Sequence, residues 1–200
     1  MTLLWKEPFS ALRTARAQAS LSDELERAER EQATTRERAE RVGGARRATG
    51  AALLAAAARD ARAEASPREA IGRLEVDALD LDAVVVEGSG DAELRDGPGR
   101  YGQTAMPGER GTVGIAGHRT TYGAPFRNLD RLSAGDRISL RMPYGRFVYA
   151  VSGTRIVDAG RKDMLAAGGR DRLVLTACHP LFGDDERIVV SADLVEARPR

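Results

Sequence analysis

The stretch RISLRMPYGRFVYAV, residues 137–151, decides the fold class of this sequence. Its two arms, 137–142 and 147–151, are short and rich in the β-branched, aromatic and large aliphatic residues that suit strands. Between them stands Pro143-Tyr144-Gly145-Arg146, and proline with glycine is typical of a tight turn. The stretch therefore predicts a β-hairpin, and the class of the surrounding chain follows from it.

Short segments of the same kind lie on both sides of this hairpin. With its two arms they bring the expected strands to about eight, and the others are Arg73–Leu79, Ala83–Val86, Thr112–Ala116, Thr154–Val157, Arg172–Thr176 and Arg187–Ala192. Short helical turns are expected over 124–131 and 161–167. Many short strands at close spacing are typical of a closed barrel or a sandwich. The segment 67–198 is long enough to bury a core of its own.

The chain before Pro67 has a different composition. Residues 10–66 are rich in Ala, Arg and Glu, which are strong helix formers, and they contain no proline. Charges of alternating sign indicate a solvated helix surface, and the apolar face is thin and mostly alanine. We predict a helical stalk with Ser22 as an N-cap and a break at Gly43-Gly44. Partial disorder is the alternative.

Membrane attachment and partners are only weakly indicated by composition. The opening residues 1–9, MTLLWKEPF, resemble the end of a longer apolar helix, so we treat them as the remnant of a membrane anchor. The longest alanine-rich apolar run, 51–58, is far shorter than the roughly 18 to 20 residues that span a bilayer. The net charge of +1 gives no support for a nucleic-acid partner.

The residues suited to nucleophilic chemistry are few. The chain has one cysteine, Cys178, and two histidines, His118 and His179. A reactive thiol needs a neighbouring base or imidazolium. Successive strand residues face opposite sides, so if Cys178 faces a groove, His179 faces away. His118, at the end of TVGIAGH, is therefore the favoured partner.

A third candidate, Arg187, opens the last expected strand. Its guanidinium can hydrogen-bond a substrate carbonyl and stabilise an oxyanion. Each candidate also has a purely structural explanation, because a lone cysteine is usually a small buried hydrophobe. Zinc binding by His118, Cys178 and His179 is chemically conceivable, but the paired spacing of zinc motifs is missing. We expect no metal and no cofactor.

Longer segments around these residues resemble one family. Leu175-Thr176-Ala177-Cys178-His179-Pro180, with Arg187 nine positions after the cysteine, resembles the nucleophile segment of sortases. GIAGHRTTYG at 114–123, followed by Pro125-Phe126, is similar to their histidine segment. VVVEG at 84–88 and LRDGPGRY at 94–101 resemble the class E type of high-GC Gram-positive bacteria. The resemblance covers about residues 70–197.

The resemblance implies a fold and an activity. It implies a closed eight-stranded β-barrel over 67–198, with Cys178, His118 and Arg187 as the catalytic residues. Sortases cut an LPXTG-like sorting signal between Thr and Gly, and class E members are associated with Ala in place of Pro. A thioacyl intermediate is then resolved by an amine of peptidoglycan precursor or of a pilin lysine. Ala177 departs from the family's pattern, because a second threonine is common there.

The resemblance also implies a location and a groove. The family usually carries a membrane anchor before a helical linker, which places the enzyme at the extracytoplasmic face of the membrane. Candidate substrate-binding residues are Thr120, Thr121, Tyr122 and Thr176, and the loops 159–169 and 181–186 are candidate rims.

Other readings remain open. An L,D-transpeptidase would need a Ser-x-Gly-Cys-x-Arg segment, and a caspase-like protease expects Gln-Ala-Cys; the sequence Thr-Ala-Cys-His-Pro matches neither. A cell-surface scaffold built on an inactive barrel is the non-enzymatic alternative.

Overall fold

The computed structural model describes residues 7–41, 49–166 and 170–200. Two helices, α1 (Glu7–Arg41) and α2 (Gly50–Glu64), precede the strands. A short helix, α3 (Asp91–Leu94), lies between the second and third strands. The single-turn 3-10 helices are η1 (Asp77–Leu79), η2 (Leu129–Arg131) and η3 (Lys162–Leu165). The strands are β1 (Ala70–Val76), β2 (Leu81–Glu87), β3 (Gly99–Arg100), β4 (Thr112–Ala116), β5 (Arg137–Met142), β6 (Gly145–Asp158), β7 (Arg172–His179) and β8 (Glu186–Pro199).

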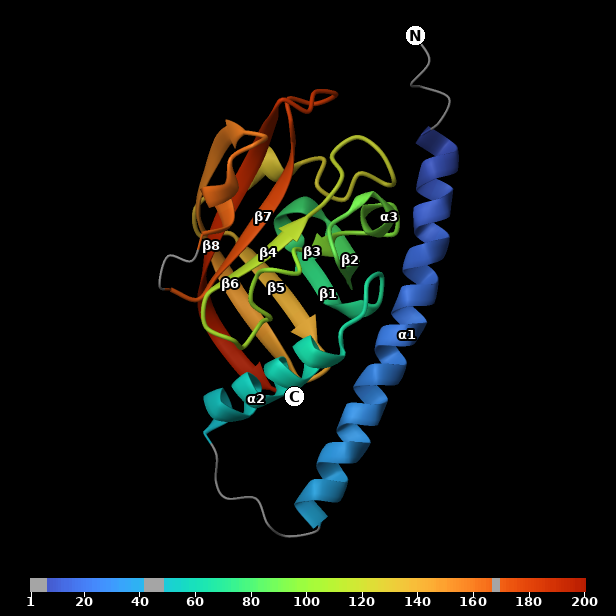
Figure 1. The fold of residues 1–200 in the computed structure, drawn as a ribbon, viewed down its shortest axis with the longest axis vertical. Coiled ribbons are helices and arrows are strands. Elements are labelled where there is room, and N and C mark those ends of the chain that lie inside the picture. The colour runs from blue at the N-terminus through green and yellow to red at the C-terminus, as the bar shows by residue number, and fades with distance from the viewer. Residues whose placement is uncertain (1–6, 42–48, 167–169) are drawn as a thin grey trace.

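The strands close into one barrel in the order β1-β2-β3-β4-β7-β8-β6-β5 (Figure 1). The pairs β2–β3 and β4–β7 are parallel, and the other pairs around the barrel are antiparallel. The predicted closed eight-stranded barrel is therefore confirmed.

The strands differ in two places from those expected. The segments 147–151 and 154–157 belong to one long strand, β6, whose register shifts between Val151 and Gly153. The two-residue strand β3 was not expected, because a pair of residues is too short to show any alternation. The observed number of strands still equals the expected eight, because two expected strands form the single strand β6 and the unexpected strand β3 is added.

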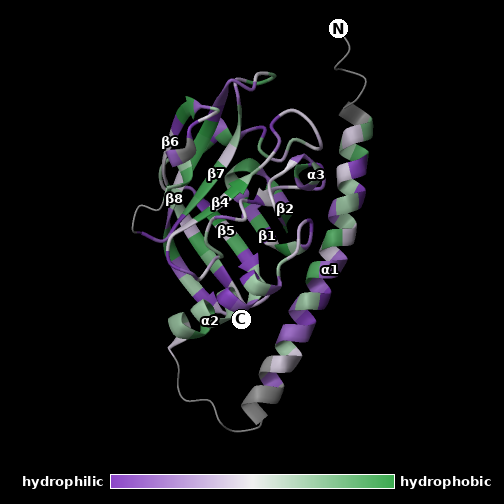
Figure 2. Cartoon of the chain, viewed as in Figure 1, coloured by the Kyte–Doolittle hydropathy of each residue, from purple (hydrophilic) through white to green (hydrophobic). Residues whose placement is uncertain are grey.

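The core fills the inside of the barrel. Its walls are built from alternate strand residues, so the strands appear as green bands of apolar residues in Figure 2. On β7 the inward residues are Leu173, Leu175 and Ala177. Helix α2 lies across one end of the barrel and adds Leu54 and Ala58 to this core (Figure 1).

Helix α1 packs along the outside of β1 and β2 and buries more than its thin apolar face suggests. Leu21 and Leu25 form a cluster with Ala70, Val84 and Val86. The expected start at Ser22 is wrong, since the helix begins at Glu7 and Ser22 lies inside it, where its hydroxyl accepts a hydrogen bond from Arg73. The helix formers before Ser22 extend the helix past that cap signal. The expected break at 43–44 lies outside the described residues.

The side chain of Gln18 on α1 forms the backbone hydrogen bonds that a neighbouring strand would otherwise form with Val84 of β2. Its amide Nε2 donates to the carbonyl of Val84 at 3.0 Å, and its Oε1 accepts from the Val84 N–H at 2.7 Å. Strand β3 pairs with β2 only at Val86 and Glu87, so it does not reach Val84. The side chain therefore satisfies both backbone groups where the ladder ends. In the ranges that the structure describes, no helix is apolar and long enough to cross a bilayer.

We predict that Gln18→Ala destabilises the fold by about 1–3 kcal/mol, because it leaves two backbone groups of Val84 without their protein partner. Urea unfolding measures the change. Gln32→Ala is the matched control, since Gln32 is an exposed residue of the same helix. Equal stability of the two variants would show that the α1 contact contributes nothing.

Candidate functional site

The parallel pairing of β4 with β7 brings two distant segments together. Its register runs from Thr112 opposite Arg172 to Ala116 opposite Thr176, and each pair is separated by the same number of positions. The Gly117 N–H then donates to the Thr176 carbonyl at 3.1 Å, which closes the ladder. Continuing this register by two residues places His118 opposite Cys178.

A contact beyond the ladder supports this continuation. Arg119 Nη1 lies 3.0 Å from Nδ1 of His179, and these two residues have the same separation in sequence as the ladder pairs. In sequence, His118 and Cys178 are therefore bracketed by two contacts between these segments, Ala116–Thr176 before them and Arg119–His179 after them. The second contact keeps the segment that follows β4 near the end of β7.

The alternation of the strands places Cys178 on the outer face of the barrel. Leu175 and Ala177 face the core, so Val174, Thr176 and Cys178 face outward. The outer face carries its own small apolar cluster of Val157, Val174 and Val189, covered by Met164 and Leu165. Because Gly114 has no side chain, Leu165 and Tyr101 approach β4 on this same face.

Arg187 lies directly across from Cys178 in the antiparallel β7–β8 pair. Directly opposed residues share a face, so the guanidinium stem and the thiol lie on the same outer side. Both side chains are partly buried. Nη1 of Arg187 donates to the carbonyls of Asp184 at 2.7 Å and Glu186 at 2.9 Å, which ties the arginine to its own loop. Cys178 and Arg187 thus lie across from each other on β7 and β8, and His118 follows the end of β4, the strand that pairs with β7 on its other side.

The His118 ring contacts the ring of Tyr122, with 5.0 Å between their centroids. The Arg95 guanidinium lies over the Tyr122 ring, 5.9 Å from its centroid. Burial lowers the pKa of His118 below its usual value; the Asp91 carboxylate opposes this and the Arg95 guanidinium adds to it. Within the described part of the chain, the buried Nε2 of His118 has no hydrogen-bond partner.

The loop after His118 is held by a buried phenylalanine. The Phe126 N–H donates to the His118 carbonyl at 3.0 Å, and the Phe126 ring packs against Gly117. A Cβ at Gly117 would lie 2.6 Å from that ring, so only glycine allows the approach. The Gly-His and Pro-Phe pairs of the histidine segment therefore belong to one small structural unit.

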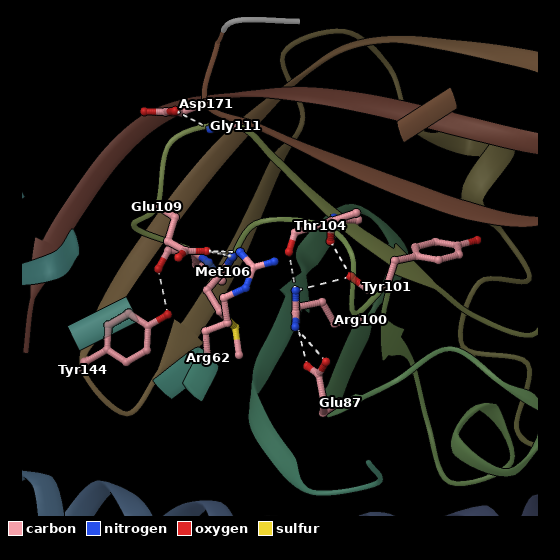
Figure 3. A network of polar contacts seen from close by, with 12 residues as sticks. Arg62, Glu87, Arg100, Tyr101, Thr104, Met106, Glu109, Gly111, Tyr144 and Asp171 are labelled. Atoms are coloured by element: carbon pink, nitrogen blue, oxygen red, sulfur yellow. Dashed lines mark hydrogen bonds and ion pairs between the residues drawn. The ribbon is translucent and has the colours of Figure 1, made fainter. Parts of the chain in front are cut away.

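A buried polar network supports the outer face below Cys178. The Arg100 guanidinium forms two 2.7 Å bonds with the Glu87 carboxylate and also donates to the carbonyls of Tyr101 and Thr104 (Figure 3). The Tyr101 hydroxyl in turn lies 2.8 Å from Oγ1 of Thr176. This chain of contacts links the barrel wall to the residue two positions before the cysteine.

The candidate substrate-binding residues occupy two different environments. Thr120, Thr121 and Tyr122 follow His118 in a partly exposed loop, and Tyr122 has a left-handed backbone with φ of 53°. Its N–H donates to the Ser10 hydroxyl of α1 at 3.3 Å. Thr176 is 1% exposed, so it reaches the outer face only beneath Tyr101. Residues 167–169 of one candidate rim lie outside the described residues.

Sequence reasoning missed several neighbours of the site. It assigned no role to Asp91, Arg95, Tyr101 or Arg119, although all of these except Asp91 lie inside the segments that carried the resemblance. Their positions depend on long-range pairing, which local patterns do not show. Among the described residues, no group of three or more metal-ligating side chains is present.

Comparison with known proteins gives the family to which this fold belongs. The family model of the sortase domain matches residues 74–195, and the chain therefore belongs to the sortase family. The chain is 31% identical to Sortase D of Bacillus subtilis (strain 168) over 113 residues, which are 56% of each protein. It thus spans little more than half of that relative's length.

Solved structures agree with this assignment. A sortase D5 transpeptidase of Clostridium perfringens superposes with a TM-score of 0.64 at 26% identity, over 70% of this chain and 88% of the other. Sortase E1 of Streptomyces coelicolor, solved with a tripeptide in its active site, gives a TM-score of 0.63 at 30% identity, over 68% and 94%.

The lowered pKa of His118 gives a prediction for stability. An unfolded histidine takes up a proton near its ordinary value of 6.5, whereas the folded ring does so only at lower pH. Between these values the unfolded chain holds more protons, so this contribution to stability is present above pH 6.5 and is lost as pH falls toward the folded pKa. When pH falls from 7.5 to 5, the free energy of unfolding should therefore decrease less in His118→Gln than in wild type. Urea unfolding across this range is the measurement, and identical slopes would contradict the burial of a neutral ring.

Proposed function

We propose that this chain is a cysteine transpeptidase with Cys178 as nucleophile, His118 as acid and base, and Arg187 as the group that stabilises the oxyanion. The observation that carries the proposal is that Cys178 pairs with Arg187 across β7 and β8, while His118 follows the end of β4, which pairs with β7 on its other side. A thiol, an imidazole and a guanidinium then flank one place where a peptide carbonyl can lie.

The reaction divides into two acyl transfers. The Cys178 thiolate adds to the carbonyl carbon of the scissile peptide, and the resulting oxyanion accepts hydrogen bonds from Arg187. As the C–N bond breaks, the His118 imidazolium donates its proton to the departing amine, which leaves a thioacyl enzyme. An incoming amine then loses a proton to the neutral His118 ring, attacks the thioester and releases the thiolate.

The protonation states limit this reaction. Burial lowers the pKa of His118, whereas donation of a proton to the leaving amine needs the charged ring. The imidazolium is then a minority form near neutral pH, which favours slow turnover. The carboxylate of Asp91 opposes the effect of burial and supports the charged ring.

The substrate class follows from family membership. We propose that the first substrate is a protein with a C-terminal LPXTG-like sorting signal, cut between Thr and Gly, with the class E resemblance favouring Ala in place of Pro. The acceptor is an amine of peptidoglycan precursor or a pilin lysine. Thr120, Thr121 and Tyr122 line the groove in this proposal, with residues 159–166 and the β7–β8 loop 181–186 as rims. Thr176 is buried beneath Tyr101 and supports the groove from below.

The location belongs to the same proposal. Such substrates occur at the extracytoplasmic face of the membrane, so we place the enzyme there, attached through a segment before α1. The start of α1 and the β7–β8 loop lie toward the same end of the molecule, opposite α2 (Figure 1). An anchor before α1 would therefore hold the site end of the barrel near the membrane.

A scaffold with an inactive barrel is the second candidate, and thiol chemistry separates the two. A partly exposed Cys178 beside His118 favours reactivity over an inert role. A scaffold would leave the thiol unreactive toward iodoacetamide, and substitution of Arg187 would have no effect.

We predict that Cys178→Ala and His118→Ala abolish cleavage of an LAXTG or LPXTG peptide, because each removes a group that forms or breaks a bond. Arg187→Lys should lower kcat by about 10²–10³, since lysine lacks the planar fork that matches the oxyanion and carbonyl. Release of the Gly-containing fragment, followed by mass spectrometry, is the measurement.

Arg137→Lys is the matched control for the arginine, because Arg137 opens β5 at an exposed position. It should keep wild-type kcat. Wild-type activity in Arg187→Lys, or substantial cleavage by Cys178→Ala, would contradict the assigned roles.

A further inference from the structure

Arg119 and His179 form a second cross-strand pair directly behind the candidate catalytic pair. Each follows its partner by one residue, so Arg119 comes after His118 and His179 after Cys178. Arg119 is 3% exposed, and its Nη1 lies 3.0 Å from Nδ1 of His179. Its Nη2 forms a 2.8 Å ion pair with Asp130 of η2.

The chemistry of the two groups fixes the direction of this hydrogen bond. A guanidinium is always charged and only donates, so Nδ1 of His179 must be the acceptor. The His179 ring is therefore neutral in this arrangement and carries its proton on Nε2. Asp130 holds the other arm of the same guanidinium, so the planar group is fixed between η2 and the end of β7.

The position of the pair gives it a mechanical role. The backbone ladder between β4 and β7 ends with the bond from Gly117 to Thr176, one residue before His118. The Arg119–His179 contact restrains the same two segments one residue after His118. The candidate base thus lies between two fixed points, one made by backbone and one by side chains.

The burial of Arg119 needs an explanation, because an arginine exposed to solvent would be sufficient if the loop after His118 only required a polar residue. Burying a guanidinium costs free energy unless its partners compensate, so its placement here calls for a specific reason. The neighbouring loop also needs restraint, because Tyr122 adopts a left-handed backbone three residues later.

We propose that Arg119 and His179 are positioning residues that set the separation between the His118 ring and the Cys178 sulfur. We call this pair the Arg119–His179 clamp. The inference rests on the proposed transpeptidase function, and it adds two residues that do not touch the reacting atoms. A misplacement of about 1 Å in a reacting pair costs about 10²-fold in rate, so loss of the clamp should be visible in kinetics.

Two substitutions of His179 test the hydrogen bond itself. His179→Leu removes the acceptor, whereas His179→Asn retains one, since its Oδ1 takes a place close to that of Nδ1. The single-turnover rate of thioacyl formation should fall about 10-fold or more in His179→Leu and recover to within about threefold of wild type in His179→Asn. The loss should appear in kcat rather than in KM, because substrate contacts are unchanged.

Arg119→Met tests the other partner. It should match His179→Leu, and the double variant should be no slower than either single variant, because both remove one interaction. Arg62→Met is the control, because it also removes an arginine ion pair, here the 2.7 Å pair between Arg62 of α2 and Glu109 of the loop before β4. Rates are divided by the folded fraction of each variant, measured by thermal unfolding, so that a loss of fold is not counted as a loss of positioning.

A readout without substrate separates the clamp from the sortase proposal. The rate of Cys178 alkylation by iodoacetamide as a function of pH reports how an adjacent imidazolium stabilises the thiolate. This profile should shift in His179→Leu and Arg119→Met but not in His179→Asn or Arg62→Met. If wild type cleaves no sorting peptide and the profile still shifts in this pattern, the clamp stands and the proposed function fails.

Two results would overturn the clamp. One is a wild-type normalised rate and an unshifted alkylation profile in both His179→Leu and Arg119→Met. The other is an equal loss in His179→Asn and His179→Leu, which would show that the imidazole matters for a reason other than accepting from Arg119.

Discussion

The parallel pairing of β4 with β7 is the constraint on which the site depends. Parallel neighbours cannot be joined by a tight turn, and here β5 and β6 intervene in the chain between them. The pairing keeps one register along the whole ladder, from Thr112 opposite Arg172 to Ala116 opposite Thr176. A slip of one residue would turn every side chain of β7 to the other face and carry Cys178 into the core. The buried residues of both strands oppose such a slip, so core packing and site geometry are set by the same register.

Because side chains alternate along a strand, β4 and β7 contribute both to the core of the barrel and to the candidate site on its outer face. Inward positions such as Ile115 and Leu175 fill the barrel, and the outward positions one residue away build the floor of the site. The floor is reinforced from behind by the buried pair of Arg100 and Glu87, which fixes the Tyr101 loop against Thr176. Breaking a buried ion pair by removing one partner costs about 3–5 kcal/mol, so this network belongs to the stability of the barrel as well as to the shape of the groove.

The sequence predicts what is local and leaves open what is distant. The 137–151 hairpin and the pairing of Cys178 with Arg187 join segments that are neighbours along the chain, so turn chemistry and spacing are sufficient to place them. Two residues of β3 carry no pattern. The extension of α1 back to Glu7 is favoured by helix propensity and by the side-chain hydrogen bonds of Thr14 and Gln18 to the barrel domain. The pairing of the histidine segment with the cysteine segment through β4 and β7 could be anticipated only from family resemblance, because no local rule predicts which strands lie parallel. Arg119 escaped notice for the same reason, since its partner becomes visible only once the register is known.

The environment of His118 shows why the site needs support from outside the three proposed catalytic residues. Burial favours the neutral ring, whereas donation to a leaving amine requires the charged one, so burial and catalysis act in opposite directions. Asp91 on α3 partly offsets burial, and Arg95 works against it. The backbone carbonyl of Arg95 accepts a 2.8 Å hydrogen bond from the Thr14 hydroxyl of α1. The Ser10 hydroxyl of the same helix accepts a hydrogen bond from the Tyr122 N–H. The helix that the sequence analysis treated as a stalk is therefore bonded to Tyr122, whose ring contacts the imidazole, and to Arg95, whose charge acts on it. It belongs to the framework that holds these two residues near His118.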